Sequence, residues 1–351
     1  MDRNKPKTVF VGVSGGVDSS VSLALLKEQG FNVVGCFIKT WQPDFITCTW
    51  REERRDAMRV CAALDVPFLT IDAEREYKEL VGEHFINEYR AGRTPNPDVM
   101  CNKEIKFGVF LKYALAHGAD YVATGHYAIS KNGNLLIGED KTKDQSYFLW
   151  TLTKEQIEKI IFPVGHLQKS DVRKLAAKYN LPTETKKDSQ GVCFLGPIDM
   201  KEFLTHYIPK KEGSVLNMAG EIIGTHDGAL FFTLGERHGF TVTKKGIDDK
   251  PMYVIARDLE QNTITVSGDK SDEEKYKDTK KIKIDNVNWI SGVAPNADKK
   301  LQARIRYQQP LQNCRVEKDL VIFDEPQIAV SSGQSVVIYG GQIVLGGGII
   351  V

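Results

Sequence analysis

Residues 11–20 read Val-Gly-Val-Ser-Gly-Gly-Val-Asp-Ser-Ser, and this stretch decides the fold of the first half of the chain. An apolar run typical of a strand, residues 8–13, leads into it, and Val17, Val21 and Leu25 then follow at helical spacing. A strand, a glycine-rich turn and a helix in this order bring backbone N–H groups and the positive end of the helix dipole to one point, where an anion can bind. A plain turn with an Asp cap is the alternative, but the flanking strand and helix favour an anion site.

The residue types within the loop favour a nucleotide phosphate. Gly15 and Gly16 allow a tight turn and a close approach to the main chain, and Ser14 and Ser19 add hydroxyl donors. A bare carboxylate repels phosphate, so Asp18 is explained best if it helps to hold Mg²⁺ between the phosphates. The loop is neither a Walker A sequence nor a G-x-G-x-x-G fingerprint.

Outward from the loop, strand and helix patterns alternate up to about residue 205. Expected strands at 31–38, 66–71 and 121–124 are separated by expected helices at 51–64, 74–89 and 103–117. This alternation predicts a parallel sheet covered on both faces, with its ligand at the carboxyl ends of the strands. Later segments are short and alternate with period 2, at 252–256, 263–267, 281–289, 301–307, 320–323 and 335–339. They predict β-rich domains that end in a small barrel or sandwich.

Composition excludes several classes of protein. Hydrophobic residues make up 41% and charged residues 26%, which is ordinary for a globular chain, and a net charge of +1 means that local basic patches must hold any nucleic acid. The six cysteines are scattered without a C-x-x-C motif, which argues against a disulfide framework, a zinc ribbon and an iron–sulfur ligand set. With no apolar stretch of about 18 residues, we expect a cytoplasmic chain and no membrane partner.

Two cysteines stand in unusual surroundings. Cys101 follows a proline-stiffened loop and is expected at or next to a helix N-terminus, with Asp98 three residues upstream. Cys193 follows a glycine-containing turn, with Lys186 and Lys187 upstream. Helix N-termini and nearby cations favour the thiolate form. Either cysteine alone is more often an inert, half-buried thiol, but the pair together with the nucleotide loop favours a catalytic role.

The loop resembles the S-G-G-x-D-S pyrophosphate loop of the N-type ATP pyrophosphatases, which cleave ATP between the α and β phosphates. Further motifs then narrow the resemblance: N-P-D-V-x-C-N-K-E-I-K-F at 96–107, T-G-H-Y at 124–127, K-D-Q-S-Y-F at 143–148, D-S-Q-G-V-C-F at 188–194 and S-G-Q-S at 332–335. In this order they resemble the tRNA-specific 2-thiouridylase family (bacterial MnmA type), over nearly the whole chain. This resemblance implies an α/β parallel-sheet ATP-pyrophosphatase domain at 1–204, a small central α+β domain at 205–270 and a C-terminal β-barrel at 271–351.

The resemblance also implies an enzymatic mechanism. The carbon-2 oxygen of the wobble uridine, position 34, would attack the α-phosphate of ATP, and sulfur would then displace AMP. Cys193 would carry a persulfide, Cys101 would attack it as the nucleophile, and a transient Cys101–Cys193 disulfide would remain. The flipped base would lie against Asn96, Pro97 and Asp98, with Asp98 as candidate acid/base. ATP, accompanied by Mg²⁺ near Asp18, would contact Gly12, Val13, Ser14, Gly15, Gly16, Val17, Asp18, Ser19, Ile38 and Gly125. The family often has Met where this chain has Ile38, so only a main-chain or apolar contact is implied there.

Partners follow from the same resemblance. The substrates would be the tRNAs for Lys, Glu and Gln, and a cysteine desulfurase or a sulfur-relay protein would donate the sulfur. Arg304 and Arg306 alternate with apolar residues at 301–307, so both are expected to face solvent, which is also what an ordinary solvated strand would show. A hydrogen-bonded structural histidine is the alternative for His126. The expected tRNA contacts are His126, Lys143, Asp144, Gln145, Arg306, Tyr307 and Gln334.

Two other functions remain compatible with parts of the pattern. A small-molecule adenylating amidotransferase would share the loop but would need neither both cysteines nor a basic β domain. A non-catalytic RNA-binding protein with a relic nucleotide site would have no need to retain Ser14–Ser19 together with both cysteine motifs.

Overall fold

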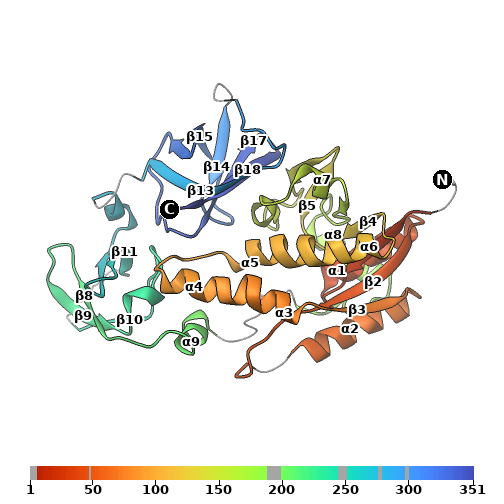
Figure 1. Cartoon of the computed structure of the whole chain (residues 1–351), viewed down its shortest axis with the longest axis horizontal. Helices are drawn as coiled ribbons and strands as arrows, with labels where there is room; N and C mark the ends of the chain where they lie inside the picture. Colours follow the sequence, from red (N-terminus) through yellow and green to blue (C-terminus); the bar gives the residue numbers. More distant parts are fainter. Residues whose placement is uncertain (1–5, 47–48, 188–198, 244–250, 276–278, 297–299) are drawn as a thin grey trace.

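The computed structural model describes residues 6–46, 49–187, 199–243, 251–275, 279–296 and 300–351. They form an N-terminal α/β domain, a smaller central domain and a C-terminal barrel, which Figure 1 shows at the right, at the lower left and at the top. Among these described residues, none of the helices is both long and apolar enough to cross a membrane.

A five-stranded parallel sheet is the centre of the first domain. Its strand order is β3-β2-β1-β4-β7, and each neighbouring pair is parallel. This confirms the parallel sheet expected from the alternating pattern. The strands are β1 (Thr8–Gly12), β2 (Asn32–Lys39), β3 (Phe68–Asp72), β4 (Tyr121–Ala123) and β7 (Ile160–Ile161).

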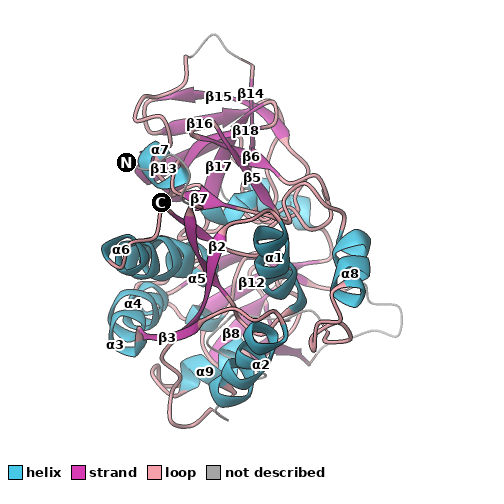
Figure 2. Cartoon of the chain, turned by 90° about the vertical axis from the view of Figure 1, so that its right-hand side faces the viewer, coloured by secondary structure: helices cyan, strands magenta, loops and turns pink. Residues whose placement is uncertain are grey.

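Helices cover both faces of this sheet, as Figure 2 shows. One face carries α1 (Val17–Glu28), α2 (Trp50–Ala63) and α8 (Lys169–Lys178), whose apolar side chains pack in one cluster with those of β1 and β2. The other face carries two composite helices. Their segments are α3 (Glu74–Tyr77), η1 (Lys78–Glu83) and α4 (His84–Arg90) in the first, and α5 (Pro97–Met100), η2 (Cys101–Phe110) and α6 (Leu111–Ala116) in the second.

These two composite helices lie side by side and extend from the sheet towards the central domain (Figure 1). The second begins at Pro97, whereas the sequence predicted a start near Lys103. Proline fits the first position of a helix because its missing N–H has no partner there, and the Asn96 side chain caps the helix by accepting from the N–H groups of Asp98 and Val99.

The central domain is built on a mixed sheet of order β10-β9-β8-β12-β11, in which only the β12–β8 pair is parallel. Its apolar side chains form one cluster with those of α4 and η2. The elements are α9 (Met200–Thr205), β8 (Gly213–Leu216), β9 (Ile222–His226), η4 (Ala229–Phe231), β10 (Phe240–Val242), β11 (Tyr253–Asp258) and β12 (Thr263–Ser267).

The C-terminal unit is a closed antiparallel barrel, because the β13–β18 pairing joins the two ends of the strand order β13-β16-β15-β14-β17-β18. After the short helix η5 (Lys270–Lys275), its strands are β13 (Lys281–Trp289), β14 (Leu301–Arg304), β15 (Gln312–Glu317), β16 (Leu320–Phe323), β17 (Ser335–Gly340) and β18 (Ile343–Ile350). The expected strand at 301–307 is therefore shorter, since β14 ends at Arg304.

The barrel is joined to the first domain by a hairpin that the sequence did not predict. Strands β5 (Ala128–Lys131) and β6 (Asn134–Ile137) follow the parallel sheet in sequence, yet β6 pairs with β18 of the barrel. Between this hairpin and α8 lie η3 (Ser146–Leu149) and α7 (Lys154–Ile157). A single apolar cluster runs from Phe10 and Val122 through Trp150 to Val337 and Tyr339, so the two domains share a core.

Candidate active site

The glycine-rich loop lies at the carboxyl edge of the parallel sheet, as predicted. β1 ends at Gly12, and α1 begins directly after the turn, with Gly16 at its N-cap. No side chain caps α1, so the N–H groups of its first turn face the loop. The Ser14 and Ser19 hydroxyls lie 3.3 Å apart, and Ser19 also donates to the Gly16 carbonyl at 3.1 Å. This arrangement suits a bound anion.

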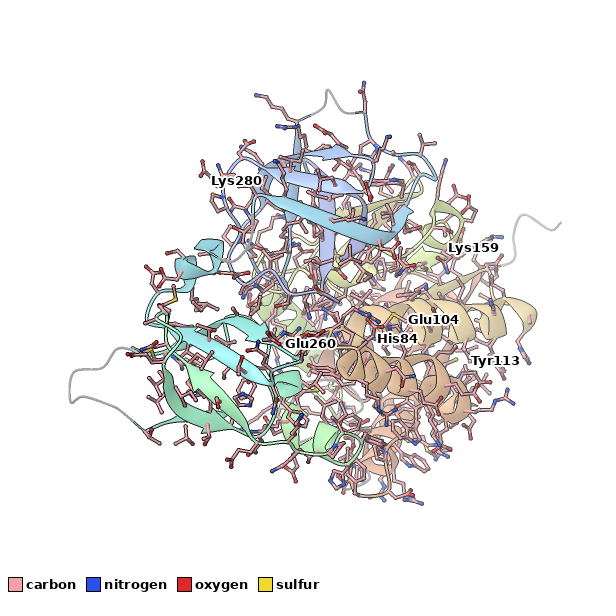
Figure 3. All side chains as sticks on the ribbon, turned by 60° about the vertical axis from the view of Figure 1, so that its left-hand side comes forward. His84, Glu104, Tyr113, Lys159, Glu260 and Lys280 are labelled. Atoms are coloured by element: carbon pink, nitrogen blue, oxygen red, sulfur yellow. The ribbon has the colours of Figure 1, made fainter. Side chains whose placement is uncertain are left out.

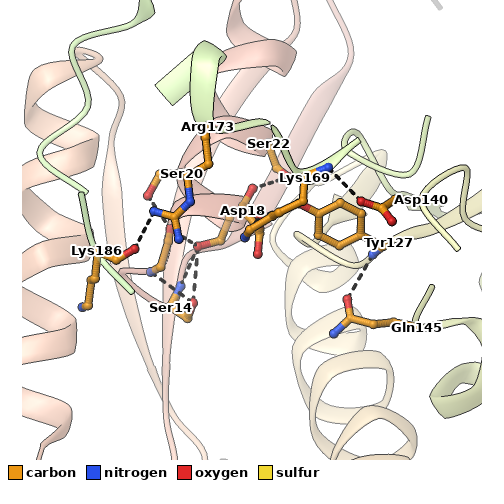
Figure 4. Close-up of polar contacts among 12 residues, drawn as sticks. Ser14, Asp18, Ser20, Ser22, Tyr127, Asp140, Gln145, Lys169, Arg173 and Lys186 are labelled. Carbon is orange, nitrogen blue, oxygen red and sulfur yellow. Dashed lines mark hydrogen bonds and ion pairs between the residues drawn. The ribbon is translucent and has the colours of Figure 1, made fainter. Parts of the chain in front are cut away.

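Two residues from distant segments hold the Asp18 carboxylate. The Tyr127 hydroxyl donates to Oδ1 at 2.7 Å, and the Lys169 ammonium donates to the same atom at 2.6 Å (Figure 4). The Lys169 side chain is only 14% exposed, and its backbone N–H donates to Asp140 at 2.9 Å. A positive charge thus lies at the loop where the phosphates of a nucleotide would bind.

Sequence reasoning missed Lys169, although one signal was present. Lys169 is the first residue of α8, where the helix dipole disfavours a positive charge. A lysine at this position, after a strand of the same sheet, is a candidate for pairing with an anion. Tyr127 belongs to the T-G-H-Y motif, but the motif alone does not predict its hydrogen bond to Asp18.

Gly125 packs against the first turn of α1, and only glycine fits there. A Cβ at this position would lie 2.7 Å from the Ser19 backbone nitrogen and 2.8 Å from the Asp18 carbonyl carbon. Gly125 therefore lies directly against the backbone of the nucleotide loop, and its expected contact with ATP stays a prediction. Ile38 lies near the carboxyl end of the neighbouring strand β2 and is half-buried.

His126 is buried between Thr124, at the end of the parallel sheet, and Lys106, on the helix that carries Cys101. Burial lowers its pKa well below the ordinary value, and nearby Lys106 lowers it further, so the ring is neutral at pH 7. Nε2 then accepts from the Lys106 ammonium at 3.4 Å, and Nδ1–H donates to the Thr124 hydroxyl at 2.7 Å. Phe107 and Phe162 flank the ring. The structure therefore favours the structural role that the sequence left open for His126.

Asp98 and Cys101 lie on the first turns of the composite helix that starts at Pro97. Cys101 is therefore inside the helix, at its fifth residue, rather than in the loop that precedes it. Its side chain is in the apolar cluster shared with the central domain, and only 4% of the residue is exposed. Burial raises the pKa of the Asp98 carboxyl group, and the positive charge of Lys106 offsets part of this rise. A raised pKa makes this carboxyl group a stronger proton acceptor than an ordinary exposed aspartate.

Lys106 lies between Asp98, at the start of the composite helix, and His126, next to the nucleotide loop. Its ammonium is near enough to Asp98 to lower the pKa of that carboxyl group, and it also contacts His126, next to Gly125 and the nucleotide loop. The structure therefore connects Asp98 to Gly125 and the loop through Lys106 and His126, whereas Cys101 lies on the same helix with its side chain in the cluster shared with the central domain. Cys193, the second predicted cysteine, lies outside the described residues.

The expected tRNA contacts separate into two groups. Asp144 is buried, and its carboxylate binds the Arg304 guanidinium and accepts from the N–H groups of Gly138 and Ser146. Arg304 is thus only 7% exposed, which corrects the expectation that it faces solvent. This pair joins the first domain to the barrel, so the structure gives Asp144 an internal role.

The remaining contacts lie nearer the surface. Lys143, Gln145, Arg306, Tyr307 and Gln334 are half-buried. The Gln334 side chain donates to the Thr94 carbonyl at 2.8 Å, and the rings of Tyr307 and Phe148 lie 4.6 Å apart. Arg306 and Tyr307 line a depression of about 440 Å³ together with Gln308, Gln309, Gln312, Pro326, Gln327 and Ile328.

No group of three or more His, Cys, Asp or Glu side chains in the described part of the chain could hold a metal ion. Asp18 is the carboxylate of the loop that could help to hold a magnesium ion that accompanies ATP. The Asp18 carboxylate fits this task, because it lies at the loop and its Oδ1 atom is already oriented by Tyr127.

A parallel sheet with an anion-binding loop at its carboxyl edge, followed by a thiol-bearing helix, defines an enzyme of the ATP-pyrophosphatase class. Family models match the chain in three consecutive parts: "tRNA methyl transferase HUP domain" at residues 7–197, "tRNA methyl transferase PRC-barrel domain" at 201–268 and "Aminomethyltransferase beta-barrel domain" at 279–350. The chain belongs to the MnmA family of tRNA-specific 2-thiouridylases.

Curated relatives support this assignment over the full length. The tRNA-specific 2-thiouridylase MnmA of Geobacillus thermodenitrificans is 46% identical and covers 97% of this chain and 94% of its own. The protein of the same name from Streptococcus thermophilus is 45% identical over 100% of this chain and 96% of its own. Among solved structures, the U34-tRNA thiolase NcsA of Methanococcus maripaludis is a distant likeness, with 18% identity, a TM-score of 0.36 and coverage of 60% of this chain and 69% of its own.

Proposed function

We propose that this chain is an ATP-dependent tRNA sulfurtransferase that replaces the carbon-2 oxygen of the wobble uridine with sulfur, giving 2-thiouridine, AMP and pyrophosphate. Membership of the 2-thiouridylase family supports the reaction as a whole. The observation that carries it is the connection between the helix of Cys101 and the nucleotide loop: Asp98 and Cys101 lie on the helix whose Lys106 contacts His126, next to Gly125, which packs against Asp18.

In the first step, the carbon-2 oxygen of the flipped uridine attacks the α-phosphate of ATP, and pyrophosphate leaves. An amide-like oxygen leaves poorly until it carries the adenylate. The loop residues Gly12–Ser19 bind the phosphates, Asp18 helps to hold Mg²⁺, and Lys169 offers a positive charge to the polyphosphate. Bound Mg²⁺ neutralises part of the charge on the phosphates.

In the second step, sulfur replaces the adenylated oxygen. Cys193 carries a persulfide, and the Cys101 thiolate attacks the bridging sulfur, which is the Sγ atom of Cys193 itself. The outer sulfur leaves as hydrosulfide, or is transferred directly, and bonds to carbon 2 while AMP leaves. A Cys101–Cys193 disulfide remains, and a thiol reductant must supply two electrons before the next turnover.

The proton inventory assigns a role to Asp98. When the adenylate forms, the N3 proton of uridine moves to a base. When AMP leaves and 2-thiouridine forms, N3 takes a proton back. A carboxyl group whose pKa is raised by burial can take and return such a proton. Asn96 and Pro97 lie beside it, at the start of the helix, where we place the flipped base.

The tRNA would approach across the barrel side of the site. Lys143, Gln145 and Arg306 provide polar and positive groups, and the ring of Tyr307 provides a stacking face beside Phe148. We assign as substrates the tRNAs for Lys, Glu and Gln, and as sulfur donor a cysteine desulfurase or a relay protein. The domain borders near 204 and 270 and a cytoplasmic location are part of the same proposal.

The deciding experiment incubates the full chain with ATP, Mg²⁺, sodium sulfide and bulk tRNA that lacks the modification, followed by mass analysis of the nucleosides. We expect 2-thiouridine and a stoichiometric amount of AMP. Cys101→Ser and Cys193→Ser, assayed with a persulfide donor, should abolish thiolation and leave tRNA binding near normal. Cys314→Ala, a buried barrel cysteine, is the matched control and should retain activity. Full activity of either serine variant would remove the proposed thiol chemistry, and ATP–pyrophosphate exchange with an amino acceptor and no tRNA would favour an amidotransferase instead.

A further inference from the structure

The segment between α4 and α5 is held by the central domain. The Arg257 guanidinium, on β11, donates to the Gly92 carbonyl at 2.5 Å and to the Phe232 carbonyl of its own domain at 2.7 Å. Gly92 adopts a positive φ of 75°, and a Cβ there would lie 2.0 Å from Cδ1 of Leu259. In Figure 3, Glu260 marks the turn after β11 beside the helix that carries His84. The central domain thus binds the backbone just before the helix that carries Cys101.

The barrel holds the same segment from another direction. The Thr94 N–H donates to the Ser332 carbonyl at 2.7 Å, and the Gln334 side chain donates to the Thr94 carbonyl at 2.8 Å. The Thr94 hydroxyl also lies 3.3 Å from the Thr233 hydroxyl of the central domain. Both backbone groups of one buried residue are therefore bound by the barrel, while its side chain contacts the central domain.

This doubly held segment leads directly into the candidate site. Asn96, which caps the helix of Asp98 and Cys101, comes two residues after Thr94. Cys101 also packs in the apolar cluster that contains Phe203 and Val254 of the central domain. The position of the proposed reacting groups thus depends also on contacts that come from outside the domain that carries the nucleotide loop.

We propose that Arg257 is a positioning residue, which fixes the Gly92–Thr94 segment and so makes the placement of Asp98 and Cys101 depend on the docked central domain. The guanidinium suits this task because its N–H groups diverge from a rigid plane and bind two carbonyls on different segments, whereas an ammonium is a point charge on a flexible stem. Arg257 is half-buried, and two of its N–H groups donate to backbone carbonyls, so the side chain is more than a solvated surface charge. The consequence for catalysis rests on the proposed function, but the structural consequence does not.

The test compares Arg257→Lys with Arg237→Lys in the full chain. Both substitutions keep the positive charge, and Arg237 is exposed in the same domain. Hydrogen exchange, measured without ATP or tRNA, should become about tenfold faster in the amides of residues 92–101 for Arg257→Lys and remain unchanged for Arg237→Lys. At saturating tRNA, the single-turnover rate of thiolation should fall about tenfold for Arg257→Lys, while Kd for tRNA stays within about twofold.

Each arm of this test has an opposing result. If hydrogen exchange in residues 92–101 were as slow in Arg257→Lys as in the unaltered chain, Arg257 would not fix this segment, and the proposal would be wrong. A loss that appears only in tRNA affinity would show that Arg257 contacts the substrate instead of positioning the helix. Gln334→Ala tests the contact from the barrel. It removes the hydrogen bond to the Thr94 carbonyl and should also accelerate hydrogen exchange of the Thr94 amide. If the unaltered chain formed no 2-thiouridine, the proposed function would fail, while the exchange comparison would still decide the role of Arg257.

Discussion

Lys169 illustrates how single residues adapt the common loop to its chemistry. Its ammonium pairs with Asp18, at the start of a helix whose dipole disfavours a cation. In the proposed reaction, the ammonium can instead pair with the phosphates of ATP, and the carboxylate with the magnesium ion proposed to accompany them. The pair thus keeps both charged groups near the loop without leaving either unpaired.

We predict that Lys169→Met slows the formation of AMP by about 100-fold at saturating tRNA, because the positive charge at the polyphosphate is lost. Lys178→Met is the matched control: it lies in the same helix, its ion pair with Glu28 is exposed, and its rate should stay within about twofold. Quenched-flow measurement of radiolabelled AMP checks both. Equal rates in the two variants would exclude a role for Lys169 in adenylation.

A second prediction at this scale concerns Asp98. Because burial raises its pKa, the folded chain binds the proton more tightly than the unfolded chain. The stabilising effect of that proton is complete at low pH and is lost as the pH rises through the folded-state pKa. Asp98→Asn should therefore be more stable than the unaltered chain at pH 7.5, and this gain should shrink as the pH falls to about 4.

Urea denaturation at both pH values checks the sign, and thiolation by the variant should fall about 100-fold because the proton carrier is lost. A stability gain that does not change with pH would contradict the assignment. Such a trade of stability for activity is common at functional sites.

Among the elements, the composite helix from Pro97 to Ala116 matters most, because its first turns carry Asp98 and Cys101, the proposed reacting groups. The Asn96 side chain accepts from two N–H groups that would otherwise lack partners. If the cap is lost, the first turn can fray, and Asp98 and Cys101 lie within about one turn of it.

We predict that Asn96→Ala costs about 1 kcal/mol of unfolding free energy and slows single-turnover thiolation more than tenfold. Asp199→Ala removes a cap of the same geometry from α9, so it should cost similar stability without the loss of rate. Asn96→Ser retains a capping hydroxyl and separates the two roles of Asn96: restored activity assigns the effect to the cap, whereas continued loss assigns it to contact with the base.

At this level the sequence predicted much of the structure. The strand–loop–helix unit at 8–28 and the parallel sheet were readable because apolar periodicity and glycine placement are local signals. The helix start was misplaced by about one and a half turns, since two prolines suggested a loop although Pro97 suits a first helical position. Lys169 and Arg257 were not predicted because their partners lie far away in sequence, and no local pattern marks such pairs.

For the whole molecule, the barrel is anchored to the first domain by buried polar groups as well as by apolar packing. Arg304 binds Asp144, the Tyr147 hydroxyl donates to the carbonyls of Ile305 and Ser335, and the Trp150 indole donates to the Ser335 hydroxyl. The sequence could not show this, because alternation at 301–307 placed Arg304 outside while the fold turns it towards a carboxylate in another domain.

We predict that Asp144→Ala lowers the unfolding free energy by about 3–5 kcal/mol, since it leaves the buried Arg304 charge without its partner. Lys143→Ala is the neighbouring control: stability should stay within about 0.5 kcal/mol, while the salt dependence of tRNA binding should fall by about one unit of slope. Urea denaturation and binding titrations at several salt concentrations check both. If Asp144→Ala weakened tRNA binding without changing the unfolding free energy, Asp144 would be a tRNA contact and not a stabilising partner of Arg304.

The hairpin β5–β6 has a consequence for how the chain matures on the ribosome. Strand β6 pairs with β5 on one side and with β18 on the other, and β18 is synthesised about 200 residues later, so one edge of β6 lacks its partner when the hairpin first emerges. Until the last strand arrives, Leu135 and the residues around it leave an open β edge that can pair with other nascent chains. Loss of the final strand should therefore cause aggregation of the whole polypeptide instead of yielding a working nucleotide-binding fragment.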